Sequence, residues 1–254
     1  MNIATRGLVE LQEITLLAAR AARGIVKRPR YIPETIAQMD LIGVGSLTII
    51  VLTGFFTGGV LTLQTYPTLA SYGALNQLGY LVSLSLVREL GPVLTALMVT
   101  GRVVSAISAE LGSMVVSQQI DAMRALGTDP VRKLVTPRII ALIITLPLLT
   151  VLADVIGICG GWAVSIGLYD LPSTMFITSV RDGITTNDII GGILKPLVFG
   201  FLMGTVACYK GLKTEGGTVG VGRSTTSAVV MASIVVIISD FFLAKALQVI
   251  LGTT

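Results

Sequence analysis

The sequence predicts an all-α polytopic membrane protein, with five transmembrane helices preceded by an amphipathic helix. Hydrophobic residues make up 53% of the 254-residue chain and charged residues only 13%, whereas soluble domains are about 25% charged. Several largely apolar stretches reach the ~20 residues that an α-helix needs to cross a bilayer. A single transmembrane domain over residues 1–254 is the simplest partition.

Residues 1–35 are predicted to form an interfacial helix. Apolar side chains recur at helical spacing from Leu8 to Ile25. The basic residues of this region are Arg20, Arg23, Lys27, Arg28 and Arg30. We expect the helix to lie on the cytoplasmic leaflet with its cations facing anionic headgroups. The same pattern also fits a soluble helix packed on a partner. A cleavable signal is not expected, because charges interrupt what would be its apolar core.

Five apolar stretches follow, and each is predicted to span the membrane: 41–64, 75–110, 139–168, 189–209 and 226–251. Tyr66-Pro67 and the region 71–76 are expected to form the turn after the first span. The second span contains Gly91-Pro92, and we expect a break or kink there because proline lacks a backbone donor.

Basic residues are distributed asymmetrically between the two sets of connections. One set carries the N-terminal cluster together with Arg102, Arg124, Arg132, Lys133, Arg138, Lys210, Lys213 and Arg223, and the opposite set carries only Arg181. The positive-inside rule therefore predicts a cytoplasmic N-terminus and an outside C-terminus.

Three pairs of glycines occur at small-xxx-small spacing: Gly54 and Gly58, Gly157 and Gly161, and Gly200 and Gly204. This spacing lets helix backbones approach closely in lipid. We expect the pairs to pack helices within one chain, although one pair could form a homodimer seam.

The region 117–137 is polar but retains helical spacing. Gly127 is predicted to stop one short helix, and Asp129-Pro130 to begin a second. These helices would protrude between spans two and three. Asp121-Ala122-Met123 followed by Gly127 resembles the Glu-Ala-Ala…Gly loop with which ABC importer membrane subunits contact their ATPases. An ordinary polar loop is the alternative. The candidate coupling residues are Gln118, Gln119, Asp121, Ala122, Met123, Gly127, Asp129 and Pro130.

Longer strings carry a more specific resemblance. They read RELGPVLTALMVTGRVVSAISAELGSM, QQIDAMRALGTDPVRKLVTPR, ITLPLLTV, GICGGW, KPLVFG and GVGRSTTSAVV, with ISDFFL near the end. Together they resemble the MlaE/YrbE-type permeases of MCE-associated lipid ABC transporters, which have plastid TGD-type relatives. The resemblance implies a permease homodimer that moves phospholipid, a separate cytoplasmic ABC ATPase, and a periplasmic MCE-domain lipid-binding partner.

Five ionisable residues are candidates for buried charges or a lipid site: Arg88, Glu89, Asp154, Lys195 and Asp240. At ~1.5 Å per residue, Lys195 and Asp240 lie at comparable depths, so they can pair. Asp154 is a candidate partner for Arg88, and Lys245 is expected to snorkel outward. The resemblance implies that the charges near the middle of the bundle lie beside an outward-opening lipid cavity. Structural ion pairing is the equally open alternative.

The composition excludes several other functions. Without histidine, and with only two cysteines, the chain offers no His/Cys zinc centre and no Ser-His or Cys-His nucleophile. The string GTVGVGRS at 217–224 lacks the strand–loop–helix context of a phosphate-binding loop. We therefore expect a transport subunit rather than an enzyme, with no cofactor, metal or nucleic-acid partner.

Two other classes of membrane protein are alternatives to a transport subunit. A proton- or ion-coupled carrier would use the buried carboxylates as relays, but the sequence shows no internal repeat. An intramembrane aspartyl hydrolase would need a catalytic motif that neither Asp154 nor Asp240 lies in. No organellar transit peptide is visible, so we expect a multi-pass protein of the bacterial inner membrane.

Overall fold

A computed structural model describes residues 3–26 and 31–251 of the chain. These residues form α-helices, short 3-10 and π-helical turns, and no strand. Five helical segments are long and apolar enough to cross a membrane: Ile32–Ser71, Leu75–Val116, Val131–Gly167, Thr186–Leu212 and Gly217–Ile250. The predicted all-helical class with five spans is confirmed.

The helices contribute to two compact units that alternate along the chain. Unit 1 contains Met1–Val44, Val99–Thr145 and Val198–Ile237, and unit 2 contains Gly45–Met98, Leu146–Leu197 and Ile238–Thr254. The long helices α2 (Ile32–Ser71), α7 (Thr136–Gly167), α9 (Thr186–Leu212) and α10 (Gly217–Leu251) each contribute residues to both units.

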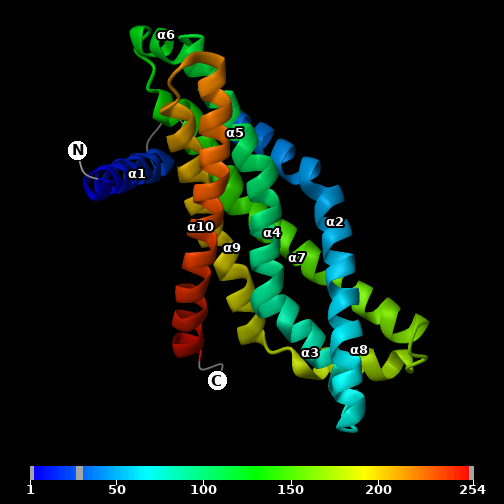
Figure 1. Ribbon diagram of the computed structural model, residues 1–254. Coiled ribbons are helices and arrows are strands. Elements are labelled where there is room, and N and C mark those ends of the chain that lie inside the picture. The colour runs from blue at the N-terminus through cyan, green and yellow to red at the C-terminus, as the bar shows by residue number, and fades with distance from the viewer. Residues whose placement is uncertain (1–2, 27–30, 252–254) are drawn as a thin grey trace. The chain divides into compact units, whose positions relative to one another are not determined.

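In unit 1, α1 (Ile3–Val26) is attached to the C-terminal end of α9 by ion pairs. Glu10 pairs with Lys210, and Glu13 Oε1 lies 2.8 Å from Lys213 Nζ. Tyr209 donates a hydrogen bond to Glu13. Figure 1 shows α1 running across the α9 and α10 segments of this unit rather than along them. The helix is therefore present as predicted, while its place at a membrane surface stays a prediction. Of the basic cluster, Lys27, Arg28 and Arg30 lie outside the described residues.

The far tip of unit 1 is formed by α6 (Gln119–Ala125) beyond α5 (Ser105–Val116) (Figure 1). The chain then returns through a π-helical segment, η4 (Val131–Val135), into α7.

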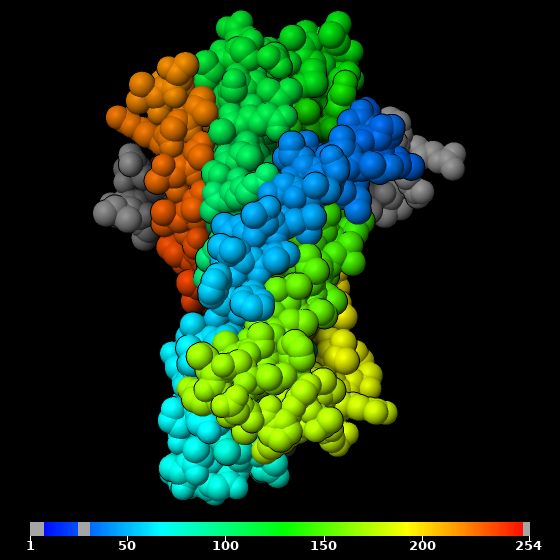
Figure 2. All heavy atoms as spheres, turned by 90° about the vertical axis from the view of Figure 1, so that its right-hand side faces the viewer, coloured from blue at the N-terminus to red at the C-terminus, as the bar shows by residue number. Residues whose placement is uncertain are grey.

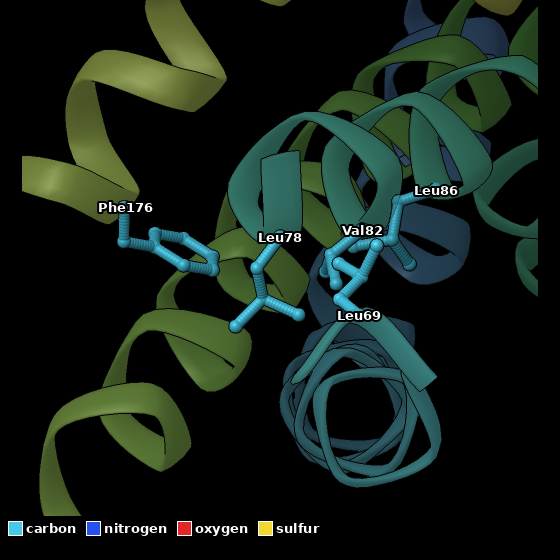
Figure 3. Close-up of a cluster of buried hydrophobic side chains, with 5 residues drawn as sticks. All are labelled: Leu69, Leu78, Val82, Leu86 and Phe176. Carbon is cyan, nitrogen blue, oxygen red and sulfur yellow. The ribbon is translucent and has the colours of Figure 1, made fainter. Parts of the chain in front are cut away.

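Unit 2 contains the start of the second span and a helix that the sequence analysis missed. The span begins with η1 (Leu75–Gln77) and α3 (Leu78–Ser85), and the additional helix is α8 (Ser173–Gly183). Leu69, Leu78, Val82, Leu86 and Phe176 form a buried apolar cluster in which the Phe176 ring points from α8 toward Leu78 (Figure 3).

Close glycine contacts join α2 to α7 within unit 2. A Cβ atom on Gly58 would collide with the carbonyl of Gly157, and one on Gly54 would lie 2.9 Å from the carbonyl oxygen of Ala153. The third glycine pair also packs inside the chain, because Gly200 lies against the backbone of Leu142 in unit 1. The prediction that these glycines pack helices within one chain is confirmed.

Two helices are longer than predicted. Helix α2 continues through Pro67 to Ser71, where the sequence predicted a turn. The Tyr66 ring is stacked on Tyr169 at 3.6 Å between centroids, and Figure 2 shows the yellow-green α7–α8 connection against the cyan end of α2. Helix α10 begins at Gly217, whereas the predicted span began at residue 226. The Ser224 hydroxyl donates to the Lys210 carbonyl 2.5 Å away, which ties the start of α10 to α9.

Candidate functional site

The second span widens where the sequence predicted a break. A π-helical turn, η2 (Leu86–Leu90), precedes α4 (Gly91–Val99), and the helix continues through both. Pro92 has no N–H to donate to the carbonyl of Arg88, its usual α-helical acceptor. Lys195 Nζ instead donates to this carbonyl oxygen at 2.9 Å. The span is therefore distorted rather than broken, and the distortion provides an acceptor for a buried cation.

Lys195 is the centre of a buried charge cluster. Its side chain is only 2% exposed, and its Nζ lies 2.5 Å from Glu89 Oε2 and 3.2 Å from Asp240 Oδ1. The Arg88 carbonyl is the third oxygen around it. Two of these contacts, with Glu89 and with the Arg88 carbonyl, are hydrogen bonds, while Asp240 Oδ1 is an ion-pair partner that accepts no hydrogen bond among the described residues. The predicted pairing of Lys195 with Asp240 is confirmed, and Glu89 joins the same cluster.

Arg88 is held by a residue that the sequence analysis did not select. Its Nε lies 2.5 Å from Asp188 Oδ1, and the Asp188 side chain is 1% exposed. Asp188 Oδ2 accepts hydrogen bonds from Thr185 N at 2.9 Å and Thr185 Oγ1 at 2.7 Å. Asp188 thus caps the backbone N–H of Thr185 at the start of α9, as the acidic residue of a capping box does. The prediction that Asp154 pairs with Arg88 is therefore wrong.

Asp154 lies apart from this cluster, against the backbone of the second span. A Cβ atom on Gly91 would collide with Asp154 Oδ1, so the glycine provides the room that this carboxyl group occupies. Asp154 is 8% exposed, and its Oδ1 has no hydrogen-bond partner among the described residues. The five sequence candidates thus divide, since Arg88, Glu89, Lys195 and Asp240 come together and Asp154 does not join them.

A cavity of about 290 Å³ lies beside the charge cluster. It is lined by η2, the start of α9 and the end of α10, with Arg88, Glu89, Asp188, Lys195 and Lys245 as its charged residues. Three cations and two anions give the lining a formal charge of +1. Phe241, Ala244 and Leu247 supply an apolar side from α10. The cavity therefore offers polar and apolar surface together, as an amphipathic ligand requires.

The predicted coupling segment has two sharp backbone turns. Gln118 (φ 57°) and Gly127 (φ 74°) flank α6 in the left-handed region. Asp129 Oδ1 accepts a hydrogen bond from Val131 N at 3.0 Å. The predicted helix stop at Gly127 and helix start at Asp129 are confirmed.

The surface of α6 is mostly open. Ile120 is 3% exposed and anchors the helix, whereas Leu126 directly after it is 83% exposed. Asp121 and Arg124 form an exposed ion pair of 2.9 Å on its surface. The role of this segment in coupling stays a prediction.

Comparison with known proteins places the chain among membrane permeases. The family described as Permease MlaE matches residues 35–246. A "Probable ABC transporter permease protein" of Rickettsia prowazekii is 43% identical over 231 residues, covering 91% of this chain and 89% of the relative. The intermembrane phospholipid transport system permease protein MlaE of Haemophilus influenzae is 38% identical, covering 84% of this chain and 82% of the relative. The chloroplastic protein TRIGALACTOSYLDIACYLGLYCEROL 1 of Arabidopsis thaliana is 36% identical, covering 91% of this chain and 66% of the relative.

The named relatives are permease subunits of transport systems rather than enzymes. The geometry does not favour the alternative of an ion-coupled carrier, because Glu89 and Asp240 both form ion pairs with Lys195.

Proposed function

The chain belongs to the MlaE permease family, and from this membership we propose that it moves phospholipid as the membrane subunit of an ABC transporter. A separate ATPase supplies the energy, and an MCE-domain protein exchanges lipid with the permease on the outer side of the membrane. The working unit contains two copies of the chain in a bacterial inner membrane, with cytoplasmic N-termini and periplasmic C-termini.

The observation that carries this proposal is the charged cavity at the start of α9. Its walls belong to segments long and apolar enough to span a membrane, where ionisable side chains are expensive and mark functional sites by default. A phospholipid has a charged headgroup and apolar chains, and the cavity presents cations beside Phe241 and Leu247. We assign headgroup binding to this cavity, with Arg88 and Glu89 at its polar side.

The four clustered candidates take different roles in this proposal. Lys195 and Asp240 brace η2, α9 and α10 against one another, because the buried lysine bonds to the Arg88 carbonyl on η2 and pairs with Asp240 on α10. Arg88 and Glu89 are 34% and 50% exposed and can still reach a ligand. Asp154 has no assigned contact with lipid.

The ATPase contact is assigned to the α6 segment. Gln118, Gln119, Asp121, Ala122 and Met123 begin the proposed docking surface, and Gly127, Asp129 and Pro130 set the return of the chain into η4. Because α6 is short and bounded by two left-handed residues, movement of a bound ATPase reaches α5 and α7 as a rigid-body displacement.

A pull-down experiment tests the ATPase part of the proposal. The tagged full-length chain is purified in mild detergent together with the proteins that bind it, and ATP hydrolysis is measured. We expect Leu126→Glu to remove the co-purifying ATPase activity, because it places a charge on the proposed contact. Val219→Glu, another exposed apolar position at 66% exposure, is the matched control and should retain it. Absence of any ATPase from the wild-type complex, or equal loss in both variants, would overturn the assignment.

A further inference from the structure

We infer that Lys245 is a second phosphate-binding cation of the cavity, and that Asp188 is a positioning residue that aims Arg88 at the same phosphate. The inference rests on the proposed function, and it names the part of the lipid that the cavity recognises. It also separates the cations that bind ligand from the one that holds the helices together.

Lys195 is buried among protein oxygens and is poorly placed to bind a ligand. It donates hydrogen bonds to the Arg88 carbonyl and to Glu89, forms an ion pair with Asp240, and its side chain is 2% exposed. A phosphate could reach it only by displacing one of these oxygens. Removing a partner from a buried charge is costly, so the lysine is excluded as the main headgroup ligand.

Arg88, in contrast to Lys195, is held by a protein partner at one nitrogen only. Nε donates to Asp188, and no hydrogen bond from Nη1 or Nη2 occurs among the described residues. A guanidinium has five N–H donors in a rigid fork, so a contact at Nε sets the plane in which the other four point. Asp188 is itself fixed by two bonds from Thr185. The start of α9 therefore sets the direction of Arg88, whose side chain is 34% exposed beside the cavity.

Lys245 approaches the same cavity from α10. Phe241, Ala244, Lys245 and Gln248 line it at helical spacing, so they form one face of the helix. Lys245 is exposed and has no ion pair with any described carboxylate. Arg88 and Lys195 have carboxylate partners whereas Lys245 has none among the described residues, so the cavity that all three line has one uncompensated positive charge, which matches the single negative charge of a phosphate diester.

Photolabelling of the full-length chain tests the inference. The purified chain in detergent is exposed to photoactivatable phosphatidylglycerol, or to diacylglycerol that carries the same acyl chains and photoreactive group but no phosphate. We expect the wild type to prefer the phospholipid. Lys245→Gln and Asp188→Asn should each lower phospholipid labelling about tenfold, the value of one charge-assisted hydrogen bond, and leave diacylglycerol labelling unchanged. A folding defect would reduce both labels together.

Thr185→Val is the matched control for Asp188. It removes the hydroxyl bond at the start of α9 but leaves the carboxylate to hold Arg88, so phospholipid preference should persist. Unchanged preference for phospholipid over diacylglycerol in Lys245→Gln or in Asp188→Asn overturns the inference but not the proposed function. Wild-type labelling by both lipids alike also overturns it. If the wild type takes up neither lipid, the proposed function fails together with the inference.

Discussion

Replacing Lys195 with methionine is the sharpest test of the charge cluster. Methionine keeps an unbranched side chain of similar length in this buried position but removes the charge and all three donors. Glu89 and Asp240 would then face each other without a cation between them. The Arg88 carbonyl, to which Pro92 has no N–H to donate, would lose the hydrogen bond from Lys195.

The expected loss of unfolding free energy depends on how exposed each partner of Lys195 is. Breaking a buried ion pair costs about 3–5 kcal/mol, and this applies most directly to Asp240, whose side chain is 19% exposed. Glu89 is 50% exposed, so its share is reduced toward the ~0–1 kcal/mol of a surface pair. An unsatisfied buried carbonyl adds about 1–3 kcal/mol. Because these contributions overlap, we expect a total loss of about 3–5 kcal/mol.

Unfolding of the purified chain in mixed detergent micelles, followed by circular dichroism, measures this loss. Lys245→Met is the matched control, because that lysine is exposed, and it should change stability by less than ~1 kcal/mol. The triple variant Glu89→Gln, Lys195→Met, Asp240→Asn should recover part of the loss, since no uncompensated charge remains. The reasoning is refuted if Lys195→Met loses less than ~1 kcal/mol, or if Lys245→Met loses as much.

Two further predictions concern the helix contacts. Gly58→Val should destabilise the chain by at least ~1–3 kcal/mol in the same unfolding assay, because a Cβ there collides with the Gly157 backbone. Gly101→Ala is the control, because no atom lies within 4 Å of a Cβ there, and it should change the unfolding free energy by less than ~1 kcal/mol. The pKa of Glu13 is lowered from its ordinary 4.5, chiefly by the hydrogen bond from Lys213. Its stabilisation of α1 is thus complete at neutral pH and lost as pH falls through that lowered pKa. A spin label on α1 should gain mobility in acid, and Glu13→Gln should be mobile already at pH 7; equal mobility of both proteins at pH 7 would contradict this.

The features that the sequence predicted well are those set by local physical chemistry. Hydrophobic length predicts a span wherever about 20 residues are mostly apolar, and all five spans were found in this way. Glycine after a short helix, and aspartate before proline, predicted both ends of the α6 turn. Depth along two helices was enough to pair Lys195 with Asp240, because both positions follow from counting residues.

The features that the sequence did not predict depend on segments distant along the chain. Arg88 and Asp188 are 100 positions apart, and no local pattern relates them. A signal for Asp188 did exist, because Thr185-x-x-Asp188 before an apolar run is a capping box. The predicted span began at 189 and so left out this helix turn. Helix α8 was missed because it is too short and too polar for the hydropathy criterion that found the spans.

Pro92 connects the fold of the second span to the chemistry beside it. Its missing N–H removes the usual α-helical donor of the Arg88 carbonyl, and a carbonyl at membrane depth that loses its donor needs another group to supply one. Lys195 supplies that donor from α9 and, once there, needs counter-charges, which Glu89 and Asp240 provide. Because Lys195 is buried among these three oxygens, we expect it to brace the helices, whereas Arg88 on the same turn is 34% exposed and keeps the N–H donors of Nη1 and Nη2. The choice between bracing the helices and binding lipid therefore has a different answer for each cation, and it follows from the burial and the remaining donors of each.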